Sequence, residues 1–114
     1  MKQADIWLID LDPTKGKQIQ KKRPAIIIND NALGKLPLKI IVPITDWKER
    51  YSIAPWMVKL TPTTSNGLKK DSSADCFQIR SITKERIKKK IGHIDEKTFE
   101  NIQVAIKKIL SIDF

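Results

Sequence analysis

The stretch QIQKKRPAIIIND, residues 18–30, sets phosphate-binding side chains directly against a hydrophobic run. Its cations Lys21, Lys22 and Arg23 precede Pro24, and four apolar residues follow. A guanidinium is planar and permanently charged, and its N–H groups match two oxygens of one phosphate. Arg23 is therefore a candidate phosphate-binding residue. From residue type alone, a solvated arginine before an edge strand explains the same pattern.

The charge distribution indicates a polyanionic partner. The 114-residue chain carries 22 Lys and Arg against 13 Asp and Glu, a net charge of +9, and such a balance attracts nucleic acid. No acidic residue stands between Asp12 and Asp30, where the cations are Lys15, Lys17, Lys21, Lys22 and Arg23. The basic run 84–90 contains one acid, Glu85. We interpret this run first as a solvated face and second as an auxiliary binding surface.

Several other kinds of site are excluded by the sequence. His93 is the single histidine, so two histidines of one chain cannot share acid and base roles, and we expect a structural or surface role. Cys76 is the single cysteine, which excludes an internal disulfide, and we expect it to be buried. No metal-ligand spacing, serine triad or phosphate-binding glycine loop is present. We expect neither a metal nor another cofactor.

The elements that must position these residues are short strands. Apolar, β-branched runs predict strands at residues 5–11, 24–28, 38–44, 54–60, 76–82 and 87–94. Trp7 and Trp56 lie inside such runs and are expected in the core. Residues 61–75 contain Pro62, Gly67 and many hydroxyls, which predict a mobile surface loop. Neither a secretory signal nor a membrane span is recognisable, so we expect a cytoplasmic protein without membrane contact.

The C-terminal segment changes to a helical period. Apolar residues recur three or four apart from Phe99 to Leu110, as one face of an amphipathic helix requires. Asp95 is the predicted N-cap, and the predicted helix covers residues 96–110. Residues 1–114 therefore form a single domain that is mainly β with a C-terminal helix, and many short strands of this kind favour a small β-barrel.

Five collinear segments resemble the MazF/PemK family of toxin endoribonucleases. They read IWLIDLDPTKG, RPAIIIND, VPIT, QIRSITKERI and IGHIDEKTFENI, and they extend from about residue 4 to the C-terminus. The resemblance implies an SH3-like small β-barrel, similar to MazF and CcdB, that forms a homodimer. It also implies the toxin of a type II toxin-antitoxin system, which cuts single-stranded mRNA at short sequences without a metal. A cognate antitoxin with an acidic tail is expected to cover the RNA groove.

The resemblance assigns the catalytic roles to Arg23, in the RP motif, and to Thr45, after the P-I pair. In such an enzyme the 2′-hydroxyl attacks the phosphate and leaves a 2′,3′-cyclic phosphate and a 5′-hydroxyl. Arg23 would stabilise the phosphorane, and one preorganised donor of this kind is worth roughly 10²- to 10³-fold in rate. Thr45 would donate its hydroxyl to a phosphate oxygen. From residue type alone, Thr45 is a strand-end hydroxyl bonded to local backbone.

The predicted RNA-binding surface centres on the loop before Arg23. Lysines hold backbone phosphates, Gly16 permits a close turn, and Trp47 with Tyr51 offers stacking surfaces for bases. Gln78 and Arg80 match the family's Q-x-R motif. The predicted set is Lys15, Gly16, Lys17, Gln18, Lys21, Lys22, Trp47, Gln78 and Arg80.

The chain departs from the family pattern at three positions. Gln18 stands where a glutamate is usual, Lys21 replaces a glycine, and Phe77 replaces an acidic residue before the glutamine of Q-x-R. The changes at Gln18 and Phe77 remove acceptors for protons or base edges, so they bear on the recognised sequence and on the rate. Two alternatives stay open. One is a non-catalytic inhibitor resembling the CcdB toxins that poison DNA gyrase, and the other is a decayed toxin that only binds RNA or antitoxin.

Overall fold

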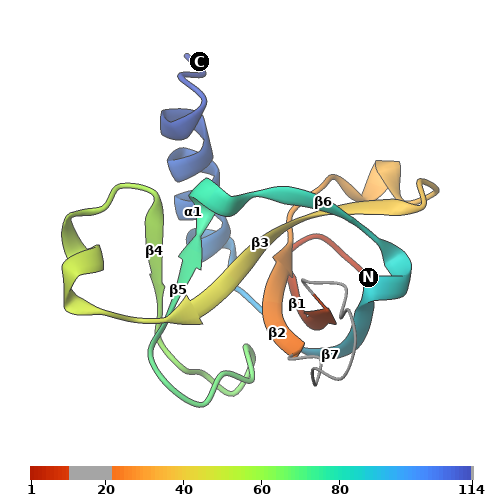
Figure 1. Cartoon of the computed structure of the whole chain (residues 1–114), viewed down its shortest axis with the longest axis horizontal. Coiled ribbons are helices and arrows are strands. Elements are labelled where there is room, and N and C mark those ends of the chain that lie inside the picture. Colours follow the sequence, from red (N-terminus) through yellow and green to blue (C-terminus); the bar gives the residue numbers. More distant parts are fainter. Residues whose placement is uncertain (11–21, 114) are drawn as a thin grey trace, which may run out of the picture.

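The computed structural model describes residues 1–10 and 22–113, which form one antiparallel sheet and one α-helix (Figure 1). The strands are β1 (Asp5–Asp10), β2 (Lys22–Ile27), β3 (Leu38–Asp46), β4 (Met57–Leu60), β5 (Ser72–Asp75), β6 (Arg80–Thr83) and β7 (Ile87–His93). The helix is α1 (Glu96–Ile109), and the 3-10 turns are η1 (Asn31–Leu33), η2 (Glu49–Ile53), η3 (Cys76–Gln78) and η4 (Lys84–Arg86). The mainly β fold with a C-terminal helix is confirmed.

Strand β3 is the spine of the sheet. The strand order is β4-β5-β3-β2-β1-β7, and β6 also pairs with β3. The first half of β3 pairs with β6, and its last three residues pair with β5, while β2 pairs with its middle. The sheet is open rather than closed into a complete barrel, and it curves around β3 (Figure 1). The nine-residue strand β3 therefore joins β4 and β5 on one side to β2, β1 and β7 on the other.

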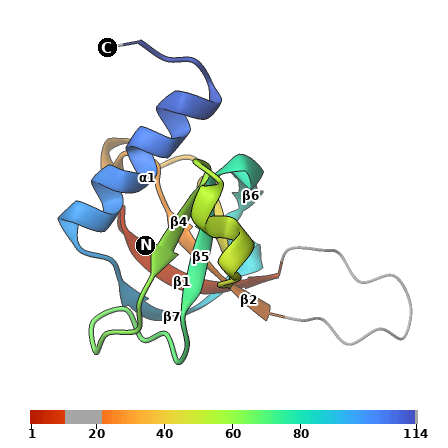
Figure 2. The same cartoon turned by 90° about the vertical axis from the view of Figure 1, so that its left-hand side faces the viewer.

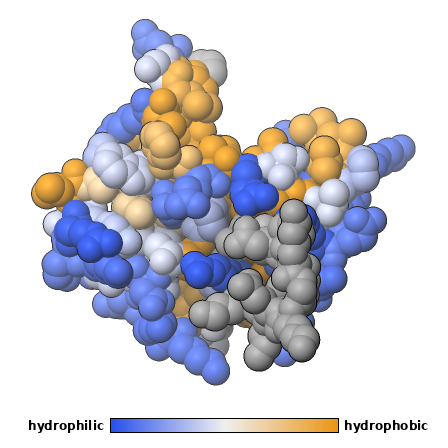
Figure 3. Space-filling model, in the orientation of Figure 1, coloured by the Kyte–Doolittle hydropathy of each residue, from blue (hydrophilic) through white to orange (hydrophobic). Residues whose placement is uncertain are grey.

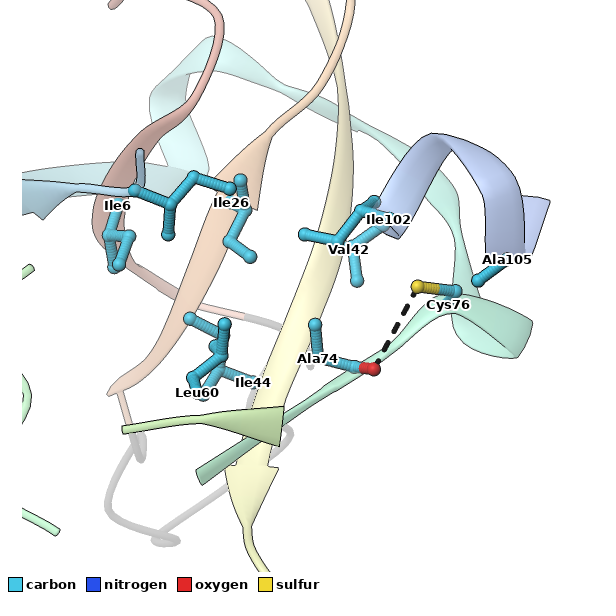
Figure 4. Packing of buried hydrophobic residues seen from close by; sticks show 10 residues of the cluster. Ile6, Ile26, Val42, Ile44, Leu60, Ala74, Cys76, Ile102 and Ala105 are labelled. Carbon is cyan, nitrogen blue, oxygen red and sulfur yellow. Dashed lines mark hydrogen bonds between the residues drawn. The ribbon is translucent and has the colours of Figure 1, made fainter. Parts of the chain in front are cut away.

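The two faces of the sheet carry two separate hydrophobic clusters, because successive side chains of a strand point to opposite faces. The larger cluster includes Ile6, Ile26 and Val42, all fully buried, and α1 covers it with Ile102 and Ala105 (Figure 4). The smaller cluster lies on the other face and contains Ile9, Ala25, Ile27, Ile41, Ile82 and Ile87. The continuous isoleucine runs of β2 and β3 therefore supply a core on both faces, as predicted.

Helix α1 begins and is oriented as its sequence predicts. The Asp95 carboxylate accepts a hydrogen bond of 2.7 Å from the backbone N–H of Thr98 and caps the helix. The helix lies across the sheet and contacts β4 and η3 (Figure 2). Cys76, at the start of η3, is fully buried beside it, as expected, and burial raises the pKa of its thiol to about 12.

The segment between β4 and β6 differs most from its prediction. β5 lies within the predicted loop 61–75, and residues 76–78 of the predicted strand 76–82 form η3. The β5 sequence, Ser-Ser-Ala-Asp, has no apolar run. It is a strand because its backbone pairs with β3 on one side and with β4 on the other. The predicted strand 54–60 begins only at Met57, and Trp56 is 41% exposed, so its assignment to the core was wrong.

Trp7 lies where it was expected, at the edge of the smaller cluster, and its indole N–H donates to Asp5 at 3.4 Å.

No helix in the described part of the chain is long and apolar enough to cross a membrane.

The packing of α1 on the sheet gives a stability prediction. Ile102→Ala removes a fully buried side chain from the centre of the larger cluster, so we expect the free energy of unfolding to fall by about 2 to 5 kcal/mol. Chemical denaturation measures this loss. Gln103→Ala, at an exposed position on the same helix, is the control and should change stability little. Equal effects of the two variants would contradict the observed orientation of α1.

Candidate phosphate-binding site

The pairing of β2 with β3 brings the two predicted catalytic residues together. Ala25 lies opposite Pro43, and Ile26 lies opposite Val42. Beyond this pairing β2 continues to Arg23 along β1 and β3 continues to Thr45 along β5, and both residues line the same pocket. Pro24, between Arg23 and Ala25, has no N–H to donate, which suits the point where the pairing of β2 with β3 ends.

Arg23 and Thr45 line one pocket of about 860 Å³. Its lining among the described residues includes five cations, Lys22, Arg23, Lys69, Lys70 and Lys89, and one carboxylate, that of Asp46. Apolar side chains complete the walls, among them Leu8, Ile44, Leu68 and Ile91. A pocket of this size and charge suits a polyanion that also presents flat apolar groups.

The carboxylate of the pocket is already engaged. Asp46 Oδ2 lies 3.0 Å from Lys70 Nζ, and both side chains are exposed, at 61% and 69%. An exposed ion pair of this kind contributes only about 0 to 1 kcal/mol. A phosphate can therefore replace Asp46 as the partner of Lys70 at little cost.

Much of the predicted RNA-binding set lies elsewhere or outside the described residues. Lys15, Gly16, Lys17, Gln18 and Lys21 fall in residues 11–21, outside the described part of the chain. Lys22 lines the pocket. The three remaining members, Trp47, Gln78 and Arg80, are not among the residues that line it.

Trp47 is held by its own neighbours. Its indole N–H donates to Glu49 Oε1 at 3.2 Å, and Lys59 Nζ lies 5.0 Å from the ring centroid. Tyr51 meets the same ring edge-on, with centroids 6.0 Å apart. These contacts fix the orientation of Trp47 close to Thr45, since only Asp46 separates the two residues along the chain.

Gln78 is the last residue of η3, and Arg80 is the first residue of β6. Gln78 is exposed, and its Nε2 donates to Asp75 Oδ2 at 2.9 Å. Arg80 is exposed at the start of β6, opposite Ile41. Phe77, the departure from the family pattern, is 66% exposed and meets Trp56 edge-on at 6.2 Å.

Three lysines of the pocket are absent from the RNA-binding set that was predicted from the sequence. Lys69 and Lys70 lie in the segment that was predicted to be a mobile loop, and Lys89 lies in the basic run 84–90, which was interpreted first as a solvated face. Lys88 and Lys90 are paired with carboxylates of β1, whereas Lys89 lines the pocket. Strand alternation alone does not predict this division, because the pairing of β7 with β1 shifts register twice.

Two buried carboxylates of β1 are paired with Lys88 and Lys90 of β7. Lys90 Nζ lies 3.4 Å from Asp5 Oδ1, and Lys88 Nζ lies 3.9 Å from Asp10 Oδ2. Burial raises the pKa of Asp5, but hydrogen bonds from the Lys2 backbone and the Trp7 indole and the charge of Lys90 outweigh it, so the pKa is lowered. Lys88 and Lys90 therefore each have a carboxylate partner.

Comparison with known proteins gives a consistent assignment. Residues 2–110 match the family described as PemK-like, MazF-like toxin of type II toxin-antitoxin system. The chain is 30% identical over 113 residues to endoribonuclease MazF9 of Mycobacterium tuberculosis, covering 94% of this chain and 93% of the relative. It is 28% identical over 116 residues to endoribonuclease EndoA of Bacillus subtilis, covering 100% of this chain and 98% of the relative.

Solved structures show the same fold. A MazE-MazF crystal structure from Deinococcus radiodurans matches with a TM-score of 0.82 at 16% identity, over 99% of this chain and 97% of that one. A mycobacterial endoribonuclease in complex with its cognate antitoxin matches with a TM-score of 0.78 at 17% identity, over 100% of this chain and 98% of that one.

The lowered pKa of Asp5 gives a prediction for stability against pH. A carboxylate whose folded pKa lies below its unfolded value stabilises the fold above the unfolded pKa, about 3.9, and loses this effect as pH falls through the folded pKa. Asp5→Asn should therefore lower the free energy of unfolding at pH 7 by about 1 to 3 kcal/mol. The difference from wild type should shrink below about pH 4.

Urea denaturation at several pH values checks this expectation. Asp113→Asn, at an exposed position near the C-terminus, is the control and should match wild type throughout. A difference between Asp5→Asn and wild type that stays constant from pH 7 to pH 3 would refute the role given to the Asp5 charge.

Proposed function

Because the chain belongs to the PemK-like, MazF-like toxins of type II toxin-antitoxin systems, we propose that it cuts single-stranded mRNA at a phosphate held between Arg23 and Thr45. The endoribonuclease names of its relatives support this activity. The observation that carries the assignment of residues is that Arg23 and Thr45, from two paired strands, line one strongly basic pocket.

The pocket supplies the groups that are needed to stabilise the charge of the reacting phosphate. The 2′-hydroxyl loses its proton to solvent, and its oxygen forms a bond to phosphorus as the bond to the 5′-oxygen breaks. The 5′-oxygen takes a proton from solvent, so the products carry a 2′,3′-cyclic phosphate and a 5′-hydroxyl. Arg23 donates two N–H groups to the non-bridging oxygens, and Thr45 donates its hydroxyl to one of them. Neither residue is a general base near neutral pH, so the pair acts by orientation and by stabilising the phosphorane.

The antitoxin is the second partner. Relatives of known structure include toxins crystallised with their antitoxins, which supports an antitoxin partner for this chain. An acidic segment of that partner would complement the five cations of the pocket and block RNA. We also propose a cytoplasmic location, because the proposed substrate is mRNA.

A homodimer is supported by two exposed apolar areas. One is formed by Leu36, Leu38 and Ile40 at the start of β3, which are 52%, 44% and 39% exposed. The other is formed by exposed apolar residues at the C-terminal end of the chain, Leu110 and Ile112. Figure 3 shows hydrophobic surface over both segments on the same upper side of the molecule. A second copy that covers both areas would remove them from water.

The first test of this function is cleavage in the presence of EDTA. Wild-type protein should cut a mixed single-stranded RNA, and Arg23→Ala should cut it about 10²- to 10³-fold more slowly. Thr45→Val, which keeps the shape and removes the hydroxyl, should also be slow. Lys97→Gln, on the exposed face of α1, is the charge-matched control for Arg23 and should keep full activity.

The following results would contradict this assignment. RNA that stays intact with wild type, or an Arg23→Ala variant that cuts as fast as wild type, would each remove the proposed chemistry. Toxicity that survives Arg23→Ala without any cut would favour the inhibitor resembling CcdB. RNA binding without cleavage would identify a decayed toxin.

The homodimer has its own test. Leu38→Asp puts a charge into the proposed interface, and sedimentation should then show a monomer where wild type shows a dimer. Ile53→Asp, at an 88% exposed position on η2, is the matched control and should stay dimeric. A monomeric wild-type protein at micromolar concentration would contradict the proposal.

A further inference from the structure

The basic pocket has a wall that is remote from Arg23 in sequence. Lys69 and Lys70 come from the segment between β4 and β5, and Lys89 comes from the middle of β7. None of the three belongs to the RP, P-I-T or Q-x-R motifs. They nevertheless line the same pocket as Arg23 and Thr45, so a strand of RNA with its phosphate at that pair also passes these lysines.

The segment 61–71 is fixed by one buried side chain. Asn66 is only 6% exposed, and its Oδ1 accepts from the backbone N–H groups of Thr63 and Leu68, each at 3.0 Å. Its Nδ2 donates to the Thr61 carbonyl at 2.9 Å, and its own N–H donates to Thr63 Oγ1 at 3.0 Å. These bonds satisfy the polar groups of a long connection and hold its shape, so the predicted mobility of this loop is not supported.

Two glycines let the same segment lie directly on β7. Gly67 has a φ of +68°, and a Cβ there would meet the Ile91 carbonyl oxygen at 2.2 Å. A Cβ on Gly92 would meet the Ser65 carbonyl oxygen at 2.4 Å. The backbone N–H of His93 donates to that Ser65 oxygen at 2.9 Å. The loop and β7 are therefore one continuous surface, which sets Lys69 and Lys70 at a fixed place relative to Lys89.

The charges of this wall are free for a ligand. Neither Lys69 nor Lys89 has an ion-pair partner among residues 1–10 and 22–113, whereas Lys88 and Lys90 are paired with the β1 aspartates. Lys70 has only the weak exposed pair with Asp46. Like charges held together without a partner repel one another, and a bound polyanion relieves that repulsion.

We propose that Lys69, Lys70 and Lys89 form a preorganised subsite for RNA backbone phosphates that flank the reacting phosphate, and that Asn66 is its positioning residue. This inference rests on the proposed function for its ligand. RNA is favoured over an acidic peptide because the subsite continues from the pair assigned to the reacting phosphate. Such contacts bind without reading sequence.

The test uses an RNA that the protein cannot cut, so that binding is measured apart from activity. The probe is a fluorescent single-stranded oligonucleotide with 2′-O-methyl groups on every ribose, titrated by anisotropy at several salt concentrations. The triple variant Lys69→Gln, Lys70→Gln, Lys89→Gln should reduce the slope of log affinity against log salt by about 2, from roughly 0.7 per lost phosphate contact.

A matched pair of single variants locates the effect on β7. Lys89→Gln should reduce the slope by about 0.7. Lys88→Gln removes the same charge from the next residue, which does not line the pocket and is paired with Asp10, and should leave the slope unchanged. Equal slopes for these two variants, or an unchanged slope in the triple variant, would overturn the subsite. A triple variant that loses an acidic peptide but keeps RNA would overturn the choice of ligand.

The role of Asn66 needs a readout that lost stability alone does not move. Asn66→Ala should reduce the salt slope by about 1.4, as the double variant of Lys69 and Lys70 does, because both lysines lose their fixed position. Combining Asn66→Ala with that double variant should add nothing further. Ile102→Ala, which is destabilised without touching the loop, should keep the wild-type slope. If the slope for Asn66→Ala equals that for Ile102→Ala, Asn66 contributes to stability only and does not position the two lysines.

The same experiments separate this inference from the cleavage proposal. If 2′-O-methyl RNA binds with the predicted slopes while natural RNA is never cut, the subsite stands and the cleavage proposal fails. If natural RNA is cut and the triple variant binds with the wild-type slope, the cleavage proposal stands and the subsite fails.

Discussion

The register between β2 and β3 is the constraint on which the rest of the structure depends. It is set by alternating isoleucines that fill two different clusters, one on each face of the sheet. A slip by one residue would send each of these side chains to the opposite face and break both clusters. The same register brings Arg23 and Thr45 to one pocket. Hydrophobic packing thus fixes the geometry of a polar site that contributes little to stability itself.

The remaining walls of the pocket follow from contacts with this frame. β3 carries β5 on its last three residues, and β5 in turn ends the segment that Asn66 and Gly67 hold against β7. β7 is paired with β1, and the two β1 aspartates are paired with Lys88 and Lys90, which do not line the pocket. Strand pairing and loop contacts therefore bring cations from three separate parts of the chain to one pocket. This arrangement does not require contacts among the cationic side chains themselves. Preorganisation of this kind lowers the ordering cost of binding.

Sequence predicted the parts of the fold in which local pattern and tertiary packing agree. The helix was found because its period, N-cap and buried face coincide, and β2 and β3 were found because their isoleucines are buried. β5 was missed because Ser72 and Ser73 have no strand pattern and are buried only by their neighbours. The pair Arg23 and Thr45 was predicted from motifs, but Lys69, Lys70 and Lys89 were not, because only Asn66 and the close contact at Gly92 bring them there. Trp56 was misplaced because an aromatic in an apolar run does not reveal which side of the sheet edge it faces.

The most direct measurement of the central claim is a crystal structure of the protein with an uncleavable 2′-O-methyl RNA that contains its cleavage sequence. The account predicts one phosphate with the Arg23 guanidinium and the Thr45 hydroxyl both within about 3 Å of its non-bridging oxygens. The 2′-oxygen on its 5′ side should stand in line with the departing 5′-oxygen. A complex in which Arg23 and Thr45 contact different phosphates, or in which the RNA lies outside this pocket, would contradict the account.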